Sequence, residues 1–593
     1  MEGLKRGRPA LVRLAGSVLV LVAFAGLLHV PAAGALTVSP LNGTPDASPY
    51  SQISFLGISP AQIFSVSVVG SKSGRHAGRL ASYASASGAS FLPAHPFSPG
   101  ESVSVSALVG PKRMRVSSTF LVAYRFPIPA AASSSSAALP SKPGTVQSFV
   151  SQPGLQPPSL SVTANSQSVA AGDVFLTPSH GYGQSGTMIV DASGQLVWFA
   201  LPPHGEVAAN LQVEEYEHKP VLVWWQGRVV NGVGFGTDVI YNTSYQPVAQ
   251  IAAGNGYKAD LHAVNLTPEG SAYITAYTVV RADLSSVGGS REGMLQDALV
   301  QQIDVKTGLV MFEWHAYGHV SLSDSHWHLP TGPYPWDFFH LNAISLDPWG
   351  DGNFIISARN TWAAYEISHH TGEVPWRLGG KRSSFRMGAG TGTAWQHDVR
   401  WLPDRTLTIF DNGGWPKVHS QSRVLRERVD LVHHEVSLIG RAVHTPALLS
   451  GSQGNDEVMP NGDSFVGWGE APYLTEFSPA GQVLFDAHLF APGQSYRAYR
   501  FPWTGTPAAP PSITVKPAPG GTATVYASWN GATQVSSWRV FAGESPTELQ
   551  LLASSLRTGF ETAIPVETGA SVFVVQALDG NGQLLGASPP FKD

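Results

Sequence analysis

The chain has 593 residues, too many for one hydrophobic core, which predicts about three or four domains. Its 62 glycines, 45 prolines and charged fraction of only 13% are typical of short strands joined by tight turns and unlike a coiled coil. A net charge of −5 supplies no basic surface for nucleic acid, and the absence of cysteine excludes disulfides, thiolate metal sites and a cysteine nucleophile.

The N-terminus has the pattern of an export signal. Basic residues up to Arg13 precede an apolar run from Leu14 to Val30, and small residues at Ala33 and Ala35 follow it. We predict a signal peptide over residues 1–35 and a secreted or cell-envelope, extracytoplasmic location. An uncleaved membrane anchor is the alternative, although the run is short for a span of about 20 residues.

Composition divides the remainder into four parts. Residues 36–126 alternate in short strand-like runs and predict an Ig-like β-sandwich. Residues 127–158 are rich in Pro, Ala and Ser and predict a linker. Strand-like runs within 506–593 predict a second sandwich, which resembles a fibronectin type III module. We expect these flanking sandwiches to contact a cell surface or glycan.

The middle of the chain, residues 159–505, carries an internal repeat. An acid or Ser, a Gly and then alternating apolar residues recur around Gly194, Gly308, Gly372 and Gly481. The intervals of 114, 64 and 109 residues fit two, one and two periods of about 55–60 residues. A repeat of this size made of short strands predicts an all-β, six-bladed β-propeller.

A second repeat places histidines at equivalent positions. His262, His340 and His397 each precede an apolar strand and a turn, and a fourth copy has Asn455 and Asp456 there instead. If these strands are the inner strands of blades, the three imidazoles converge at one mouth of the central channel.

The strands that return from these turns bring further polar residues back. A short hairpin ends beside its own beginning, which predicts that Arg359 lies near His340. By the same argument Asp411 and Asn412 lie beside His397, and Tyr277 lies beside His262.

Five strings together resemble a known family. They are His340-Leu-Asn342, Ile356 to Asn360, Thr371 to Lys381, Gln396-His397-Asp398 and Phe410 to Asn412. They resemble the bacterial arylsulfate sulfotransferases and the broader arylsulfotransferase-like propellers, over roughly residues 170–490. The resemblance implies a six-bladed propeller, export, and transfer of a sulfuryl group from an aryl sulfate donor to a phenolic acceptor without a nucleotide donor or other cofactor.

The resemblance also implies roles. His397 becomes transiently sulfated, while His340, Arg359 and His262 hold the sulfuryl oxygens. The chemistry of the residues agrees, because guanidinium and imidazolium groups donate to developing negative charge and a neutral imidazole is a nucleophile. Further expectations are substrate binding by Asn342, Asn360, Trp336 and Trp395, with Phe338 and Phe339 also near the mouth, and orientation of His397 by Asp398 or Asp411.

Two other functions stay open. Asp260, Asp398 and Asp456 could hold a metal with the histidines in a metal-dependent hydrolase, although Arg359 would oppose a cation and no metal is expected. A non-catalytic secreted propeller that binds a ligand or glycan is the main alternative. Ala343, where family members often carry Ser, is a departure from the family pattern.

Overall fold

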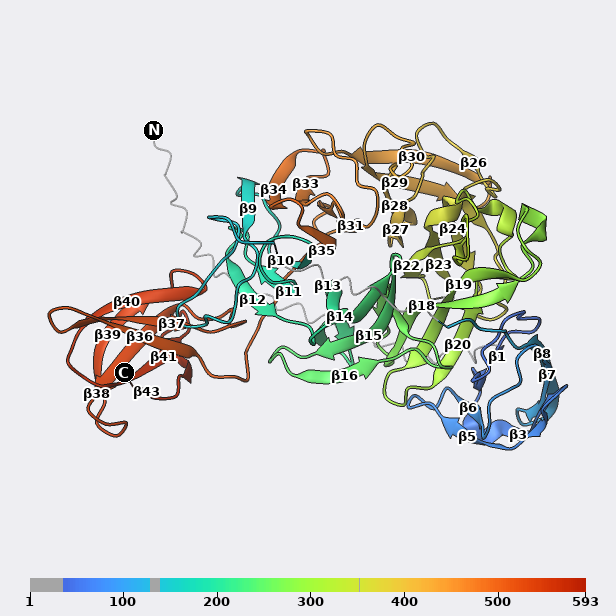
Figure 1. Cartoon of the computed structure of the whole chain (residues 1–593), viewed down its shortest axis with the longest axis horizontal. Coiled ribbons are helices and arrows are strands. Elements are labelled where there is room, and N and C mark those ends of the chain that lie inside the picture. Colours follow the sequence, from blue (N-terminus) through green and yellow to red (C-terminus); the bar gives the residue numbers. More distant parts are fainter. Residues whose placement is uncertain (1–35, 128–138, 351, 593) are drawn as a thin grey trace, which may run out of the picture. The chain divides into compact units, whose positions relative to one another are not determined.

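The computed structural model describes residues 36–127, 139–350 and 352–592, all within the unit Ala35–Asp593. The predicted signal peptide and part of the predicted linker lie outside the described residues. Those residues form strands and four short 3-10 turns, so the expectation of an all-β protein is confirmed (Figure 1). No helix in the described ranges is long and apolar enough to cross a membrane. The 3-10 turns are η1 (Pro60–Gln62), η2 (Ser285–Val287), η3 (Leu322–Asp324) and η4 (Arg359–Thr361).

The N-terminal residues form two four-stranded antiparallel sheets. In spatial order the first contains β1 (Thr37–Ser39), β2 (Ile53–Leu56), β6 (Gly88–Pro93) and β5 (Gly78–Ser82). The second contains β4 (Gly74–His76), β3 (Ile63–Gly70), β7 (Ser102–Val109) and β8 (Met114–Leu121). In β7 the buried valines alternate with more exposed serines, because one face of the strand covers the core and the other does not. Phe55 and Val105, from the two sheets, share that core.

Five sheets form the central part of the chain. In spatial order, the first sheet contains β12 (Leu196–Ala200), β11 (Thr187–Val190), β10 (Asp173–Ser179) and β35 (Gln494–Phe501). The second, of nine strands, contains β13 (Val207–Tyr216), β14 (Lys219–Val230), β15 (Val233–Tyr241), β17 (Ala259–Leu266), β18 (Ser271–Ala282), β19 (Gly293–Asp304) and β20 (Val310–His315), with β16 (Pro247–Ile251) on β15 and β21 (Trp336–Asp337) on β19.

The other three sheets have four or five strands each. The third contains β22 (Leu341–Leu346), β23 (Phe354–Ala358), β24 (Ala363–Ile367) and β25 (Arg377–Gly379). The fourth contains β26 (Arg386–Met387), β30 (Glu435–Ala442), β29 (Arg423–Asp430), β28 (Thr406–Asp411) and β27 (His397–Trp401). The fifth contains β31 (Asn455–Val458), β32 (Ser464–Gly467), β33 (Tyr473–Phe477), β34 (Val483–Leu489) and β9 (Leu160–Asn165).

The predicted histidine repeat falls at β17, β22 and β27, which lie in three successive sheets along the chain. β17 packs beside β22, β22 beside β27, and β27 beside β31. Strands in this central part are buried on both faces: in β18 every residue except Arg281 is buried. Such strands read as continuous apolar runs rather than as alternating ones.

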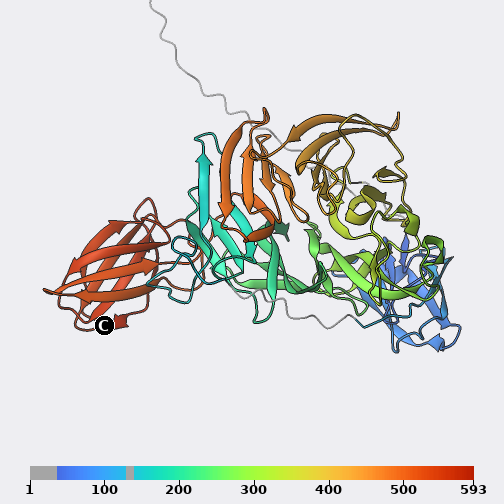
Figure 2. The same ribbon diagram turned by 45° about the horizontal axis from the view of Figure 1, so that its top comes forward.

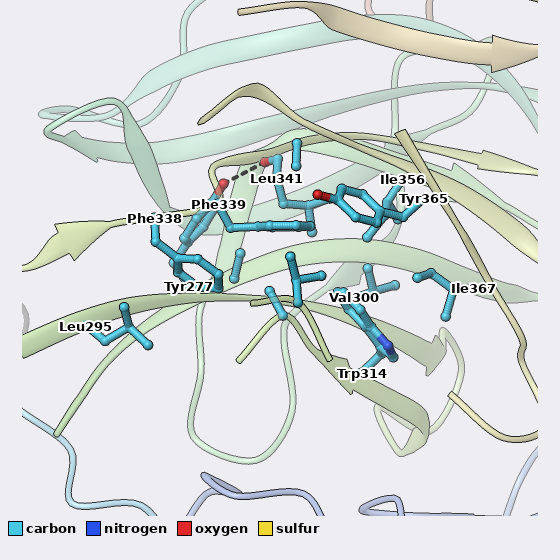
Figure 3. Packing of buried hydrophobic residues seen from close by; sticks show 14 of the residues in the cluster. Tyr277, Leu295, Val300, Trp314, Phe338, Phe339, Leu341, Ile356, Tyr365 and Ile367 are labelled. Carbon is cyan, nitrogen blue, oxygen red and sulfur yellow. Dashed lines mark hydrogen bonds between the residues drawn. The ribbon is translucent and has the colours of Figure 1, made fainter. Parts of the chain in front are cut away.

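An apolar core supports the strands that carry the histidines. Figure 3 shows Phe338, Phe339 and Leu341 packed with Tyr277, whose hydroxyl donates a hydrogen bond to the carbonyl oxygen of Leu341 (2.6 Å). Phe338, Phe339 and Leu341 are fully buried. The backbone on both sides of His340 is therefore held by close packing.

The C-terminal residues form two further antiparallel sheets, drawn in red and orange-red in Figure 1 and seen running alongside one another in Figure 2. One contains β36 (Ser512–Ala518), β37 (Thr522–Ser528) and β40 (Glu561–Glu567). The other contains β39 (Gln550–Leu556), β38 (Ser537–Gly543), β41 (Val572–Leu578) and β42 (Leu584–Ala587), with β43 (Phe591–Lys592) on β41. Val525 and Trp538 contribute to a core shared by the two sheets.

Candidate functional site

One cavity of about 490 Å³ has His262, His340, Arg359 and His397 in its wall. Asp337 is the acidic residue among the groups that line it. The cavity is therefore rich in groups that can carry positive charge, although the chain as a whole has a net charge of −5. Its other lining residues include Trp327, Tyr334, Asn360, Gln453 and Tyr496.

His262 lies in β17, where the register with β18 shifts between Ala259 and Val264. Its Nδ1 is 2.6 Å from Oδ2 of Asp260, and the same oxygen accepts from the backbone N–H of His262 and from the hydroxyl of Thr275. Burial acts to raise the pKa of Asp260, but His262 and the hydrogen bonds hold it below its ordinary value. An ionised Asp260 thus fixes the ring so that Nε2 is the nitrogen left for a ligand.

His340 and Arg359 are brought together as the hairpin argument predicts. Leu341 pairs with Ala358 between β22 and β23, and the N–H of Arg359 donates to the carbonyl oxygen of His340 (2.9 Å). Nδ1 of His340 is 2.5 Å from Oδ2 of Asp337. Burial lowers the pKa of His340, with Asp337 acting in the opposite direction. The imidazole rings of His262 and His340 have centroids 5.0 Å apart.

Arg359 is held by neutral partners. It donates to Oδ1 of Asn360 (3.0 Å) and to the carbonyl oxygens of Trp415 and Gly451, and its guanidinium carbon lies 4.9 Å from the ring centroid of Trp395. Burial lowers the pKa of Arg359 to about 10, so the group remains charged at neutral pH. Because no carboxylate neutralises Arg359 directly in the described contacts, its charge is available to an anionic ligand.

His397 is the first residue of β27, and its tautomer follows from its hydrogen bonds. The amide nitrogen of Asn412 donates to the carbonyl oxygens of Ser450 and Gln453, so its Oδ1 faces Nδ1 of His397 at 2.7 Å as an acceptor. The proton therefore lies on Nδ1. Burial, and then the charge of Arg359, keep the pKa of His397 well below its ordinary value. The ring is neutral, with its lone pair on Nε2.

That lone pair is occupied in this structure. The backbone N–H of Gln453 donates to Nε2 of His397 at 3.2 Å. Gln453 has a φ of 66°, in the left-handed region that favours glycine, and it lies in the loop that leads into β31. For Nε2 to act as a nucleophile, this N–H must move aside.

The predicted orienting carboxylates do not contact His397, and both expectations are wrong. Asp398 follows His397 at a bulge with a φ of 50°, and its carboxylate pairs with Arg400 (2.8 Å). Asp411 pairs with Arg423 (2.7 Å) on the opposite face of β28. His397 is in register with Phe410, so Asn412, two residues further on, shares its face and Asp411 does not.

The predicted aromatic substrate contacts also need correction. Trp336, Phe338 and Phe339 are buried core residues outside the cavity wall. Trp395 is likewise buried and does not line the cavity, but its ring stacks with Arg359. Aromatic side chains in the wall come instead from Trp327, Tyr334 and Tyr496.

Of the two predicted asparagine contacts, one lies in the cavity. Asn360 lines it, with its amide nitrogen donating to the carbonyl oxygen of Asp337 (2.6 Å) and its Oδ1 accepting from Arg359. Asn342 is fully buried behind it, donating to the carbonyl oxygen of Gln396 (2.8 Å). Asn342 therefore connects two neighbouring strands rather than contacting substrate.

The three acids considered as metal ligands do not converge on the histidines. Asp456 donates its N–H to Asp398, which is engaged by Arg400, and of the three histidines Asp260 contacts His262, while also accepting from Thr275 and from the N–H of Gly234. Within the described ranges, the one group of three or more His, Cys, Asp or Glu with ligand spacing is Asp46, Asp297 and His315, outside this cavity.

Sequence reasoning missed the residues that orient the histidines. The signals were short local spacings: Asp260 two residues before His262, and Asp337 three residues before His340. Asn412 was placed beside His397 but its neighbour Asp411 was given the role. Nothing in the sequence marked Gln453, because its contact is made by the backbone.

The arrangement combines a neutral nucleophile with cationic donors. Nε2 of His397 can form a bond to an electrophile once Gln453 moves, and Arg359 can stabilise negative charge next to it. His262 and His340, each oriented by a carboxylate at Nδ1, can donate from Nε2 when protonated, and an anion in the cavity favours that protonation. A site of this kind suits transfer of an anionic group.

The comparisons with known proteins agree in part. The arylsulfotransferase (ASST) family model matches residues 212–489, whereas no curated protein matches the sequence. Similar solved structures include a protein of unknown function from Bacteroides caccae (11% identity, 56% of this chain and 98% of that chain, TM-score 0.35) and an auxiliary nutrient binding protein from Bacteroides ovatus (12% identity, 81% and 92%, TM-score 0.27). Another is Sqt1 of Saccharomyces cerevisiae (10% identity, 63% and 96%, TM-score 0.29). Scores this low carry no argument about fold or function.

Proposed function

We propose that the protein is a secreted arylsulfotransferase, a proposal supported by the match of the arylsulfotransferase family model to residues 212–489. It moves a sulfuryl group from an aryl sulfate donor to a phenolic acceptor through a sulfohistidine at His397. The observation that carries this proposal is a neutral His397, with its proton fixed on Nδ1 by Asn412, beside Arg359 in a cavity with two carboxylate-oriented histidines.

In the first half of the reaction, the lone pair on Nε2 of His397 attacks the sulfur atom. The bond from sulfur to the aryl oxygen breaks, and the leaving phenolate takes the Nε2 proton of His340, which carries it as an imidazolium while the anionic donor is bound. Arg359 and His262 hold the sulfuryl oxygens while charge develops on them. The N–H of Gln453, displaced from Nε2, is then available as a further donor to these oxygens.

The second half reverses these steps with another phenol. His340 accepts the proton of the acceptor hydroxyl, the phenolic oxygen attacks sulfur, and the sulfur–nitrogen bond breaks to return the electron pair to His397. A base that changes roles between half-reactions needs a pKa near the working pH, which an Asp–His pair in a buried site can provide. Trp327, Tyr334 and Tyr496 give aromatic surface for both phenols.

We also propose that the central sheets are six blades of a propeller over residues 159–505. The nine-stranded sheet divides into β13–β16 and β17–β20, which gives six groups of about four strands. Their inner strands pack in sequence, β10 beside β13, then β17, β22, β27 and β31, and β31 beside β35, which itself pairs with β10. This order supports a closed ring. β35, from the end of the central region, completes the sheet of β10 to β12, and β9, from its beginning, completes the sheet of β31 to β34.

The remaining assignments are proposals of the same kind. The paired sheets of residues 36–126 and 506–593 fit β-sandwiches, the second with sheets of three and five strands that suit a fibronectin type III-like module. We propose that these flanks contact a cell surface or glycan. The basic and apolar N-terminus supports export to the cell envelope or beyond.

The test is incubation of the protein with 4-nitrophenyl sulfate, with and without added phenol. We expect nitrophenolate release that depends on phenol, with phenyl sulfate formed in equal amount. Release that is the same without phenol would indicate a sulfatase.

One observation favours the alternative, a binding protein that keeps the scaffold without the chemistry. In this structure the N–H of Gln453 occupies the lone pair that His397 needs for attack. Binding of 4-nitrophenyl sulfate with no release under any condition would favour that function.

A further inference from the structure

A second cluster of polar residues lies away from the cavity, where the N-terminal sheets meet the central ones. It contains Asp46 from the segment between β1 and β2, Asp297 from β19 and His315 at the end of β20. Nδ1 of His315 is 2.9 Å from Oδ2 of Asp297 and 3.1 Å from Oδ1 of Asp46. All three side chains are buried, Asp46 and His315 being each 2% exposed and Asp297 0%.

Two polar groups in this cluster lack hydrogen-bond partners among the described residues. Neither carboxylate oxygen of Asp46 accepts a hydrogen bond of normal geometry, although Oδ1 lies 3.1 Å from Nδ1 of His315, and the hydroxyl of Tyr257, whose ring centroid is 6.3 Å from that of His315, has no partner either. A buried polar atom without a partner is rare in native proteins and indicates a missing water or ion. The carboxylate of Asp46 points toward His315, so a missing ion would lie beside both groups and contact them together.

The other side of His315 is already fixed. Its Nε2 is 3.1 Å from Oε1 of Glu313, while Oε2 of Glu313 accepts from the amide groups of Asn255 (2.7 Å) and Gln301 (2.5 Å). A carboxylate that receives two amide donors is ionised, so it takes the Nε2 proton of His315. This leaves Nδ1 facing Asp46 and Asp297, the arrangement of a carboxylate–histidine–metal triad.

The cluster also contains more acidic than basic side chains, which favours binding of a cation. Asp46, Asp297 and Glu313 are three buried carboxylates around one imidazole. Arg125 is close, with its guanidinium 4.7 Å from the ring centroid of Tyr257, but it donates to Thr278, Ser48 and Gly256 and not to these carboxylates. His315 is the one cationic group that pairs with these three carboxylates in the described contacts. Burying more carboxylates than cationic partners is costly, and a bound cation lowers that cost.

We propose that Asp46, Asp297 and His315 bind a divalent transition-metal cation, Zn²⁺ or Mn²⁺, which joins the N-terminal sheets to β19 and β20. One imidazole nitrogen and two carboxylates suit such ions. Bonds of about 2.1 Å place neighbouring ligand atoms roughly 3.0 Å apart in octahedral and 3.4 Å apart in tetrahedral geometry, close to the 2.9 Å and 3.1 Å from Nδ1 of His315 to the two carboxylates. Tyr257 lies near enough to share the remaining coordination through its hydroxyl or a water.

The site is independent of the proposed sulfuryl transfer, since none of its residues lines the cavity. Its role is structural. Existing contacts already join the same elements: the hydroxyl of Ser90 donates to the carbonyl oxygen of Val310 (2.9 Å), and the N–H of Glu313 donates to Ser39 (3.0 Å). A metal would add a link that only the folded protein can form.

The experiment measures metal content in the full chain, purified without a histidine tag, incubated with Zn²⁺ or Mn²⁺ and desalted. We expect about one cation per chain, loss of that cation in Asp46→Asn and His315→Ala, and retention in Glu427→Gln, which changes a buried carboxylate elsewhere. The melting temperature should rise with metal in the wild-type protein and in Glu427→Gln but not in Asp46→Asn.

If the variants fail to fold, Co²⁺ binding by the wild-type protein still decides the question, because His315 ligation gives a visible absorption spectrum that Zn²⁺ abolishes. A folded wild-type protein that takes up none of these ions would overturn the proposal and assign a proton to Nδ1 of His315. Equal metal content in Asp46→Asn and the wild-type protein would overturn it too. The phenol-dependent assay is unaffected by either result.

Discussion

At the scale of single residues, the three histidines of the cavity differ in what orients them. His262 and His340 are each bound at Nδ1 by a carboxylate, whereas His397 is bound by the amide oxygen of Asn412. A carboxylate stabilises the imidazolium as well as fixing the tautomer, but an amide oxygen stabilises it far less. Asn412 thus keeps His397 oriented and neutral, as a nucleophile requires.

This difference predicts a change in the pH profile of Asn412→Asp. The pKa of His397 is well below its ordinary value, so wild-type kcat/KM should hold as the pH falls below 6.5 and decline only when His397 takes a proton. The new carboxylate should raise that pKa and move the acid limb upward by about one unit or more. Asn242→Asp, in a turn where Oδ1 only accepts backbone N–H groups, is the control. An acid limb that does not move would contradict the assigned role of Asn412.

Arg359 supplies the permanent positive charge of the cavity, and its removal should lower the rate of transfer. We expect Arg359→Ala to lower kcat by about 10²–10³, in line with loss of one preorganised donor to a transition-state oxyanion. Arg405→Ala is the matched control, because Arg405 also stacks on a tryptophan, Trp349, but does not line the cavity. Similar losses in both variants would show that the effect is structural.

At the scale of elements, loops rather than strands complete the site. His397 and Arg359 come from strand ends, but the N–H that covers Nε2 of His397 comes from Gln453 in the loop before β31. The next residue, Gly454, has a φ of 99°, and a Cβ there would lie 2.4 Å from the ring of Phe410. Only glycine fits this position without strain.

Gly454→Ala should therefore disturb both the loop and the site. We expect a loss of about 1–3 kcal/mol in the free energy of unfolding, from a strained φ and a clash with a fully buried ring, together with reduced transfer. Urea unfolding and the phenol-dependent assay measure the two effects. Gly392→Ala, at a site with open space, should leave both unchanged. If Gly454→Ala is as stable and as active as the wild type, the loop does not position Gln453 as described.

The sequence predicted the parts of the site in which a short turn returns one strand beside the start of its partner. His340 and Arg359 meet because β22 and β23 are joined by a short turn, and Tyr277 lies beside His262 for the same reason. The orientation of Asp398 and Asp411 was not predictable in this way, since a bulge at His397 changes which neighbour shares its face. A one-residue shift reverses the face of every side chain that follows.

At the scale of the whole molecule, composition and the repeated strand-like runs together predicted an all-β chain, because glycine, proline and uncharged residues favour short strands and turns. Which aromatic residues would face the cavity was not accessible, since Trp336 and Trp327 lie in the same irregular region and only packing decides between core and cavity. The contact of Asp46 with His315 was equally hidden, because it joins segments far apart in the chain.

The molecule also separates the proposed metal from the proposed chemistry. Guanidinium and imidazolium groups stabilise the sulfuryl oxygens, so protein depleted of metal but still folded should keep its phenol-dependent turnover. Turnover is measured at a temperature below the melting transition of the depleted protein, with metal content determined on the same sample. Loss of turnover that Zn²⁺ or Ca²⁺ restores in folded protein would instead favour a metal-dependent hydrolase.

The central claim is that Nε2 of His397 carries the sulfuryl group, and mass spectrometry of protein mixed with donor alone tests it most directly. With 4-nitrophenyl sulfate and no phenol, quenched at alkaline pH to preserve an acid-labile nitrogen–sulfur bond, the peptide that contains His397 should gain the mass of one sulfuryl group. Subsequent addition of phenol should remove it, and His397→Ala should show neither adduct nor transfer. An adduct on another residue, or wild-type turnover in His397→Ala, would contradict the account.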